Sequence, residues 1–173
     1  MECVRIIINL LKDAYAMEQA VIELLEQHSS DTEDLDIKSR LEEKTESVHF
    51  NAEKIKERVE ELDDEVSTAK TGLASIIRNM EEYPPGFEKG KVIKETIVEY
   101  GVEYFQTATY KTILIAAEEC GDEKTARLCD EIIGNERETS EYLDQNLTNV
   151  TINYINHETT EKEDINFTGD EEI

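Results

Sequence analysis

Proline and glycine, the residues that interrupt helices, are scarce in this sequence and leave long segments unbroken. The chain of 173 residues contains two prolines, which are adjacent at Pro84 and Pro85, and seven glycines. Within the unbroken segments apolar side chains recur every three or four residues, which is the period of an amphipathic helix. Because no segment shows the alternation of a half-buried strand, we expect an all-α fold.

Four long helices and one short helix follow from this period. We expect them at about residues 3–28, 31–65, 67–81, 88–120 and 122–148. Ser30 and Glu33 form a candidate capping box at the start of the second helix. The two prolines stop the short helix. Gly121 is the expected C′ residue, and Asp122 the next N-cap.

The order of these helices predicts a particular bundle. The first two are expected to be antiparallel neighbours, as are the last two, and the segment between about 66 and 87 is long enough to cross the length of the bundle. Two hairpins joined by one long crossover, here with a short fifth helix, form the ferritin-like four-helix bundle. We expect that bundle at residues 1–150. Residues 151–173 carry seven acids and one lysine, and we expect an acidic, largely disordered tail.

Charge excludes several partners. Eighteen Lys and Arg face 42 Asp and Glu, a net charge of −24, which would repel nucleic acid and anionic membranes. No apolar stretch reaches 18 residues, so no membrane span is expected. The cysteines, Cys3, Cys120 and Cys129, lack CxxC spacing. Reduced thiols in a cytoplasmic protein are the simplest interpretation.

Two acids fall on apolar stripes, where a charged side chain is costly. Glu18 lies seven residues after Leu11 and seven before Leu25, and Glu136 lies four after Ile132. A buried carboxylate requires neutralisation or pairing. A bound metal is one explanation. A protonated carboxyl group or a buried Lys or Arg partner is the alternative.

The helix at 88–120 has two apolar stripes about 100° apart on its wheel. One includes Tyr104 and Ala108, and the other includes Glu103 and Tyr110. So broad an arc is usually buried against more than one neighbour. We therefore expect a homodimer through this helix, although hydrophobicity does not decide which stripe faces the bundle interior.

The second helix contains Glu46-Ser-Val-His49, a Glu-x-x-His unit. Its two side chains reach the same side of a helix, and oxygen with imidazole suits iron, manganese or zinc. Two-metal carboxylate bundles use this unit. On the wheel, however, His49 lies only on the shoulder of the apolar stripe, and Glu46 lies further round among other acids.

Several segments resemble the YciF-like family of ferritin-like proteins, which are stress-associated proteins of uncertain activity. The resemblance covers about residues 8–148, and the segments that carry it are Leu10–Gln19, Arg40-Leu-Glu-Glu-Lys44, Val102-Glu-Tyr-Phe-Gln-Thr-Ala-Thr-Tyr-Lys-Thr112, Ala117–Glu123 and Glu136-Arg-Glu-Thr139. The third of these is the most specific.

The resemblance implies a metal site with iron or manganese. Its implied ligands are Glu18, Glu46, His49, Glu103 and Glu136. Three residues depart from the family pattern: Gln106 replaces an acid, Thr139 stands where metal-storing relatives carry histidine, and Arg40 replaces a histidine. A single metal ion or partial occupancy is compatible with so histidine-poor a site.

Two functions follow as hypotheses. One is a metal-dependent oxidoreductase that oxidises its metal or consumes peroxide or oxygen. The other is a non-enzymatic dimeric bundle, a stress or structural protein with a degenerate metal site. A scaffold that binds a partner helix is a third interpretation of the broad apolar arc.

Overall fold

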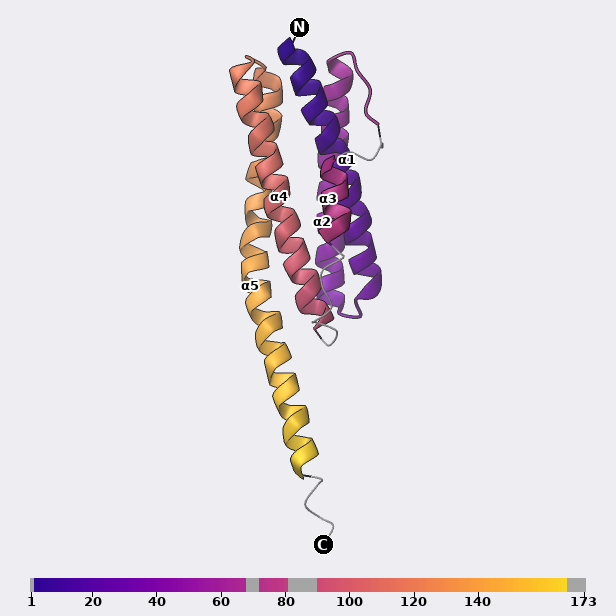
Figure 1. Cartoon of the computed structure of the whole chain (residues 1–173), viewed down its shortest axis with the longest axis vertical. Helices are drawn as coiled ribbons and strands as arrows, with labels where there is room; N and C mark the ends of the chain where they lie inside the picture. The colour runs from indigo at the N-terminus through magenta and orange to yellow at the C-terminus, as the bar shows by residue number, and fades with distance from the viewer. Residues whose placement is uncertain (1, 68–71, 81–89, 168–173) are drawn as a thin grey trace.

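Five helices and no strand form the part of the chain that the structure describes (Figure 1). This computed structural model describes residues 2–67, 72–80 and 90–167, with the backbone alone at 136–138 and 158–167. The helices are α1 (Glu2–Asp31), α2 (Leu35–Glu61), α3 (Gly72–Met80), α4 (Lys91–Glu119) and α5 (Glu123–Phe167). The all-α prediction is confirmed.

Two antiparallel hairpins lie side by side. Helices α1 and α2 form one hairpin, α4 and α5 form the other, and α3 packs on α1. Helix α2 ends at the end of the bundle where the N-terminus lies, whereas α4 begins at the opposite end (Figure 1). The connection that contains α3 therefore crosses the length of the bundle, as the sequence predicted.

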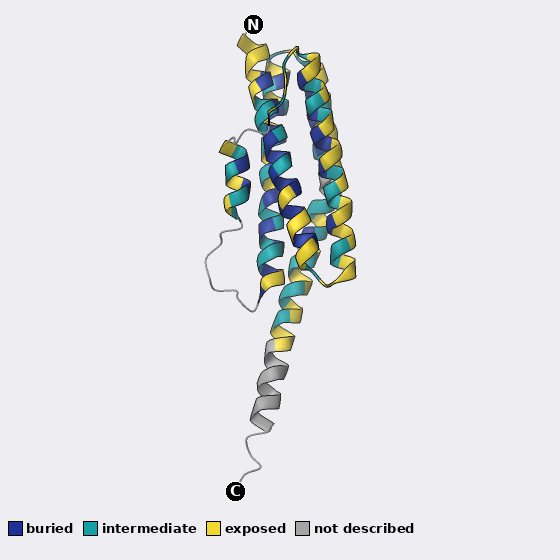
Figure 2. Cartoon of the chain, turned by 90° about the vertical axis from the view of Figure 1, so that its right-hand side faces the viewer, coloured by how far each residue is buried: buried dark blue, intermediate teal, exposed yellow. Residues whose placement is uncertain are grey.

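The long helices turn their apolar stripes toward one core (Figure 2). The largest fully buried apolar side chains include Ile7, Leu11, Met17, Ile55, Ile77, Tyr110 and Ile113. On α4, Glu103 and Tyr110 of one stripe face this core, and Tyr104 and Ala108 of the other are exposed. At the start of the helix the order is reversed, because Ile93 is buried and Val92 is exposed. The structure thus decides the orientation of α4, which hydrophobicity had left open.

The start of α2 differs from the expectation. Its N-cap is Asp34, whose side chain accepts hydrogen bonds from the backbone N–H groups of Asp36 at 2.9 Å and Ile37 at 3.1 Å. Ser30 still belongs to α1, where its hydroxyl donates to a backbone carbonyl. The expected capping box of Ser30 and Glu33 was wrong, because a carboxylate that reaches two N–H groups caps the helix further along the chain.

The turn between α4 and α5 matches the prediction and also binds α2. Gly121 has a φ of 69°, the left-handed conformation of a C′ residue. Asp122 accepts hydrogen bonds from the backbone N–H of Thr125 at 3.0 Å and from Arg58 Nη2 at 2.8 Å. Burial alone would raise the pKa of Asp122, but the hydrogen bonds from Thr125 and Arg58 outweigh it and lower that pKa. Arg58 therefore joins α2 to the first turn of α5.

Helix α5 is longer than expected. The sequence analysis predicted a helix to about 148 and a disordered tail at 151–173, whereas α5 continues to Phe167. Its second half projects beyond the bundle (Figure 1), and Ile152 and Ile155 are exposed there. Residues 123–167 contain no proline and a single glycine, so no residue in this segment breaks the helix. The double proline that was expected to end α3 lies outside the described residues.

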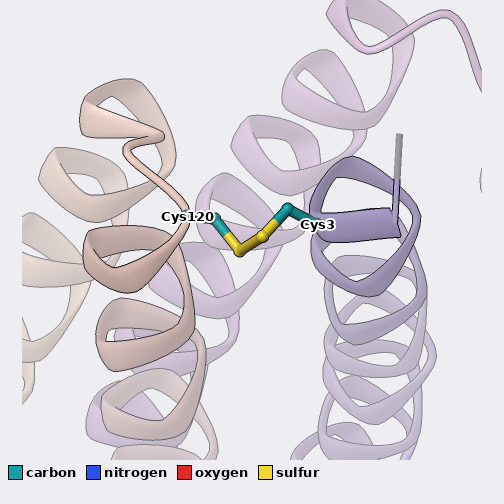
Figure 3. Close-up of a disulfide and its surroundings, with 2 residues drawn as sticks. All are labelled: Cys3 and Cys120. Atoms are coloured by element: carbon teal, nitrogen blue, oxygen red, sulfur yellow. A yellow bond between two sulfur atoms is a disulfide. The ribbon is translucent and has the colours of Figure 1, made fainter.

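A disulfide joins the two hairpins at the end of the bundle where the N-terminus lies. It links Cys3, in the first turn of α1, to Cys120, the C-cap of α4, across 117 residues of sequence (Figure 3). The expectation of reduced thiols was therefore wrong for these two cysteines. Cys129 is a free thiol, and burial raises its pKa to about 12. Since the cysteines no longer favour a reducing compartment, the cytoplasmic location stays a prediction.

A membrane-spanning segment is not found in the described part of the chain, where every helix is too short or too polar to cross a bilayer.

The disulfide should stabilise the fold mainly by restricting the unfolded chain. Cys3→Ser is expected to lower the free energy of unfolding by about 4–5 kcal/mol, because closing a loop across 117 residues of sequence removes much unfolded-state entropy. Urea unfolding with and without dithiothreitol measures it. Reductant should bring the wild type to the stability of the variant and leave the variant unchanged. Equal stability of the wild type and the variant in the absence of dithiothreitol would contradict the prediction.

Candidate functional site

Glu18 lies at the centre of the bundle and is held by two side chains of α4. Its exposed fraction is 0%, as expected from its place on the apolar stripe of α1. Gln106 Nε2 donates to Glu18 Oε2 at 2.7 Å, and the hydroxyl of Tyr110 donates to Glu18 Oε1. Gln106 and Tyr110 are four residues apart and therefore share one face of α4. Both carboxylate oxygens of Glu18 thus have hydrogen-bond donors.

Glu103 is a second buried carboxylate, one turn before Gln106 on the same face of α4. Its exposed fraction is 1%. Lys44 of α2 reaches it with Nζ at 2.9 Å from Oε2, and the Lys44 side chain is itself only 15% exposed. Removing one partner of an ion pair so far from solvent lowers stability, because the Glu103 carboxylate stays buried after the ammonium group is lost.

The position of Lys44 follows from the apolar stripe of α2. It lies three residues after Leu41 and four before Val48, both of which are buried. A lysine at this register must point toward the core. Of the two explanations for carboxylates on apolar stripes, a buried cationic partner is therefore the one observed for Glu103.

The structure separates the predicted ligands. It places Glu18 and Glu103 in the core. Glu103 lies on the inward face of α4, and Glu18 of α1 accepts hydrogen bonds from Gln106 and Tyr110 on the same face. Glu46 and His49 are exposed on α2 and do not join them. Glu136 lies on α5 one turn after the buried Ile132, but its side chain is outside the described part of the chain.

A cavity of about 260 Å³ lies beside Glu103 and Gln106, between the first half of α2 and the facing parts of α1, α4 and α5. Its apolar walls are Val21, Leu25, Ile37, Leu41, Val102 and Leu143. Its polar and charged residues are Arg40, Glu43, Lys44, Ser47, Glu99, Glu103, Gln106, Thr139, Tyr142 and Asn146. Arg40 and Glu43 are exposed, so the cavity meets solvent at their side.

The mouth of the cavity combines an aromatic ring with charges of both signs. The Arg40 guanidinium lies 4.2 Å from the centre of the Tyr142 ring, a cation–π arrangement. Burial raises the pKa of the Tyr142 hydroxyl, which therefore stays protonated at neutral pH. Glu99 pairs with His28 of α1, with Oε1 at 3.0 Å from Nδ1.

The sequence analysis missed Lys44 and Ser47. They are three residues apart and both line the cavity. This is the spacing of a Glu-x-x-His unit, with lysine in place of glutamate and serine in place of histidine. Thr139, which also lines the cavity, likewise ends a Glu-x-x-Thr unit on α5. The periodicity of α2 contains the signal for Lys44, which lies on the apolar stripe between Leu41 and Val48.

These side chains do not fit a two-metal centre. Such a centre takes a Glu from each of two helices and a Glu-x-x-His unit from each of the other two. Here α2 supplies a lysine ammonium group, which repels a metal cation, and no histidine is among the described residues that line the cavity. Within the described residues, no group of three His, Cys, Asp or Glu side chains is arranged to hold a metal ion.

Comparisons with known proteins agree with the fold. Residues 5–156 match the model of a family described as a domain of unknown function, DUF892. YciF of Escherichia coli K12 is 26% identical over 161 residues, which cover 91% of this chain and 95% of YciF. The crystal structure of YciF, described as an E. coli stress protein, aligns with a TM-score of 0.67 at 23% identity, over 89% of this chain and 97% of that chain.

Two other solved structures have the same fold. A Xanthomonas campestris protein aligns with a TM-score of 0.76 at 23% identity, over 91% of this chain and 99% of that chain. A ferritin-like diiron-carboxylate protein of Bacillus anthracis aligns with a TM-score of 0.71 at 15% identity, over 85% and 99%. The architecture is therefore the ferritin-like bundle.

Removal of the Lys44 ammonium group should destabilise the core. Lys44→Met is expected to lower the free energy of unfolding by about 3 kcal/mol, because the buried Glu103 carboxylate then loses the Lys44 ammonium group. The double variant with Glu103→Leu should recover much of this loss, since no charge remains to bury. Urea unfolding of the four proteins of this cycle measures the coupling.

Lys38→Met is the matched control, because Lys38 is half-buried on the same helix and has no ion pair among the described residues. It should change stability little. Additive effects of the Lys44 and Glu103 substitutions would show that the ion pair is not what holds Glu103 in the core.

Proposed function

The chain belongs to the DUF892 family, and from that premise we propose that it is a ferritin-like stress protein that does not depend on a two-metal centre. The ion pair between Lys44 and Glu103 is the observation that carries the proposal. It places an ammonium group where a metal would neutralise a carboxylate. The stress role rests on similarity to YciF, described as a stress protein.

The contacts of Glu18 support the same conclusion. A carboxylate that bridges metals needs lone pairs for the metals, but one lone pair on each oxygen of Glu18 already accepts a hydrogen bond, from Gln106 and from Tyr110. The donors come from α4 and join α4 to α1 directly. These hydrogen bonds would therefore stabilise the bundle without a metal ion, which is the hypothesis of a degenerate metal site.

Metal content tests the proposal. Protein expressed with added iron and manganese, and purified without chelator, should contain substoichiometric metal and should not speed the oxidation of ferrous iron. Elemental analysis and oxygen uptake measure the two quantities. Lys44→Glu combined with Ser47→His should raise the metal content, because it restores a Glu-x-x-His unit facing the cavity.

A matched pair of substitutions locates any metal that is found. Glu46→Gln combined with His49→Ala should leave the metal content of the wild type and of the Lys44→Glu, Ser47→His variant unchanged, because both side chains are exposed. Stoichiometric metal in the wild type that is lost on Glu103→Gln would overturn the proposal.

A metal-dependent oxidoreductase is the second candidate. The burial of Glu18 and Glu103 and the similar fold of a diiron-carboxylate protein favour it. In that case iron or manganese would replace the Lys44 and Tyr110 contacts and bind Glu18, Glu103 and Glu136, with Glu46 and His49 as the other ligands predicted from the sequence. The metal analysis above distinguishes the two functions.

We also propose a homodimer through α4. Tyr104, Ala108 and Ile115 are exposed along its outer face, and an apolar stripe of this kind suits a second copy of the same helix. Tyr104→Glu should reduce the mass measured by light scattering from that of a dimer to that of a monomer, because a buried charge in the interface lacks a partner. A monomeric wild-type protein would contradict this prediction.

A further inference from the structure

Gln106 holds a buried acceptor next to the cavity. The side chain is fully buried and lines the cavity, and its Oε1 has no hydrogen-bond partner among the described residues. The amide cannot be reversed to solve this, because Nε2 donates to the Glu18 carboxylate and an oxygen in its place would face another acceptor. A buried acceptor of fixed orientation is costly unless a donor reaches it.

The size and walls of the cavity indicate what kind of molecule would carry such a hydrogen-bond donor. A cavity of about 260 Å³ exceeds the roughly 150 Å³ of an apolar cavity that binds benzene. Apolar side chains of α1, α2, α4 and α5, such as Val21, Leu41, Val102 and Leu143, form one part of its wall, and polar or charged side chains form the rest. A ring-sized organic molecule therefore suits it better than a single ion.

The charges around the cavity favour an uncharged molecule. Lys44 is paired with Glu103, and Glu99 is paired with His28. Arg40 and Glu43 bring both signs of charge to the mouth. An anion or a cation would therefore meet a group of its own sign, whereas a neutral hydroxyl group meets none.

We propose that this cavity binds a small, uncharged aromatic alcohol of the phenol class. Neighbouring atoms cover Gln106 Oε1, so a small shift of the lining side chains lets the hydroxyl group donate to it. The ring packs on the apolar wall, and the molecule enters beside Arg40 and Tyr142. This inference rests on the proposed function, because a metal centre at Glu18 and Glu103 would occupy the same part of the interior.

Two probes of equal shape test it. p-Cresol carries the hydroxyl donor, and p-xylene replaces the hydroxyl with a methyl group. Titration of the full chain, followed by NMR shifts and calorimetry, should show saturable binding of p-cresol that is about fivefold tighter than that of p-xylene, the factor that one neutral hydrogen bond contributes. Equal affinities, or no saturable binding of p-cresol because water alone fills the cavity, would overturn the proposal.

Variants place the binding in this cavity. Ser47→Phe fills it and should abolish p-cresol binding, whereas Ser39→Phe, on the exposed side of the same helix, should not. Val102→Phe fills the cavity from α4 and replaces Ser47→Phe in this test if the Ser47→Phe protein does not fold. In Gln106→Leu the ratio of the two affinities should fall to about one, since no acceptor remains. Binding that survives both filling variants would overturn the proposal.

The metal content of each titrated sample separates this inference from the proposed function. Metal-free protein that does not bind p-cresol refutes only the cavity proposal. Stoichiometric metal lost on Glu103→Gln refutes the proposed function, whatever p-cresol does.

Discussion

Two carboxylates in the middle of the bundle set the conditions that the surrounding helices must meet. Glu18 and Glu103 are almost completely buried, and each needs donors at a fixed place. Helix α4 supplies Gln106 and Tyr110 to Glu18, and α2 supplies Lys44 to Glu103. A rotation of any of these helices about its axis would break a contact with a buried charge. The polar network therefore fixes the relative orientation of α1, α2 and α4, which apolar packing alone specifies only loosely.

Part of this site could be predicted from the sequence, because burial follows helical periodicity. Glu18 falls between Leu11 and Leu25, and the structure places it in the core. The same rule applies to Lys44, between Leu41 and Val48, but a search for metal ligands passes over a lysine. Glu46 and His49 have the residue types of a metal-binding motif, but their register on α2 points away from the core. Register, rather than residue type, decided which side chains of α2 reach Glu103.

The fold was predictable to a similar depth, again for local reasons. Breaker-free amphipathic segments gave the helices, and Gly121 with Asp122 gave the turn between α4 and α5. The disulfide was not predictable in this way, because Cys3 and Cys120 are 117 residues apart and meet only through the arrangement of both hairpins. The extent of α5 was misjudged for the opposite reason. Acidic composition suggested disorder, whereas continuous helix-compatible sequence carries the helix beyond the bundle.

The covalent bridge between the hairpins lies at one end of the bundle, and the cavity lies toward the other. The Cys3–Cys120 bridge joins α1 to α4, and Arg58 joins α2 to the first turn of α5, both near the turn between α4 and α5. The cavity is lined by the first half of α2 and by residues 139–146 of α5, many residues away from these ties along both helices. Local opening is easiest where the fewest contacts must break. A small separation of α2 from α5 at the cavity would leave the disulfide and the Arg58 hydrogen bonds in place. A molecule of ring size can therefore enter beside Arg40 and Tyr142 while the opposite end keeps the two hairpins in register.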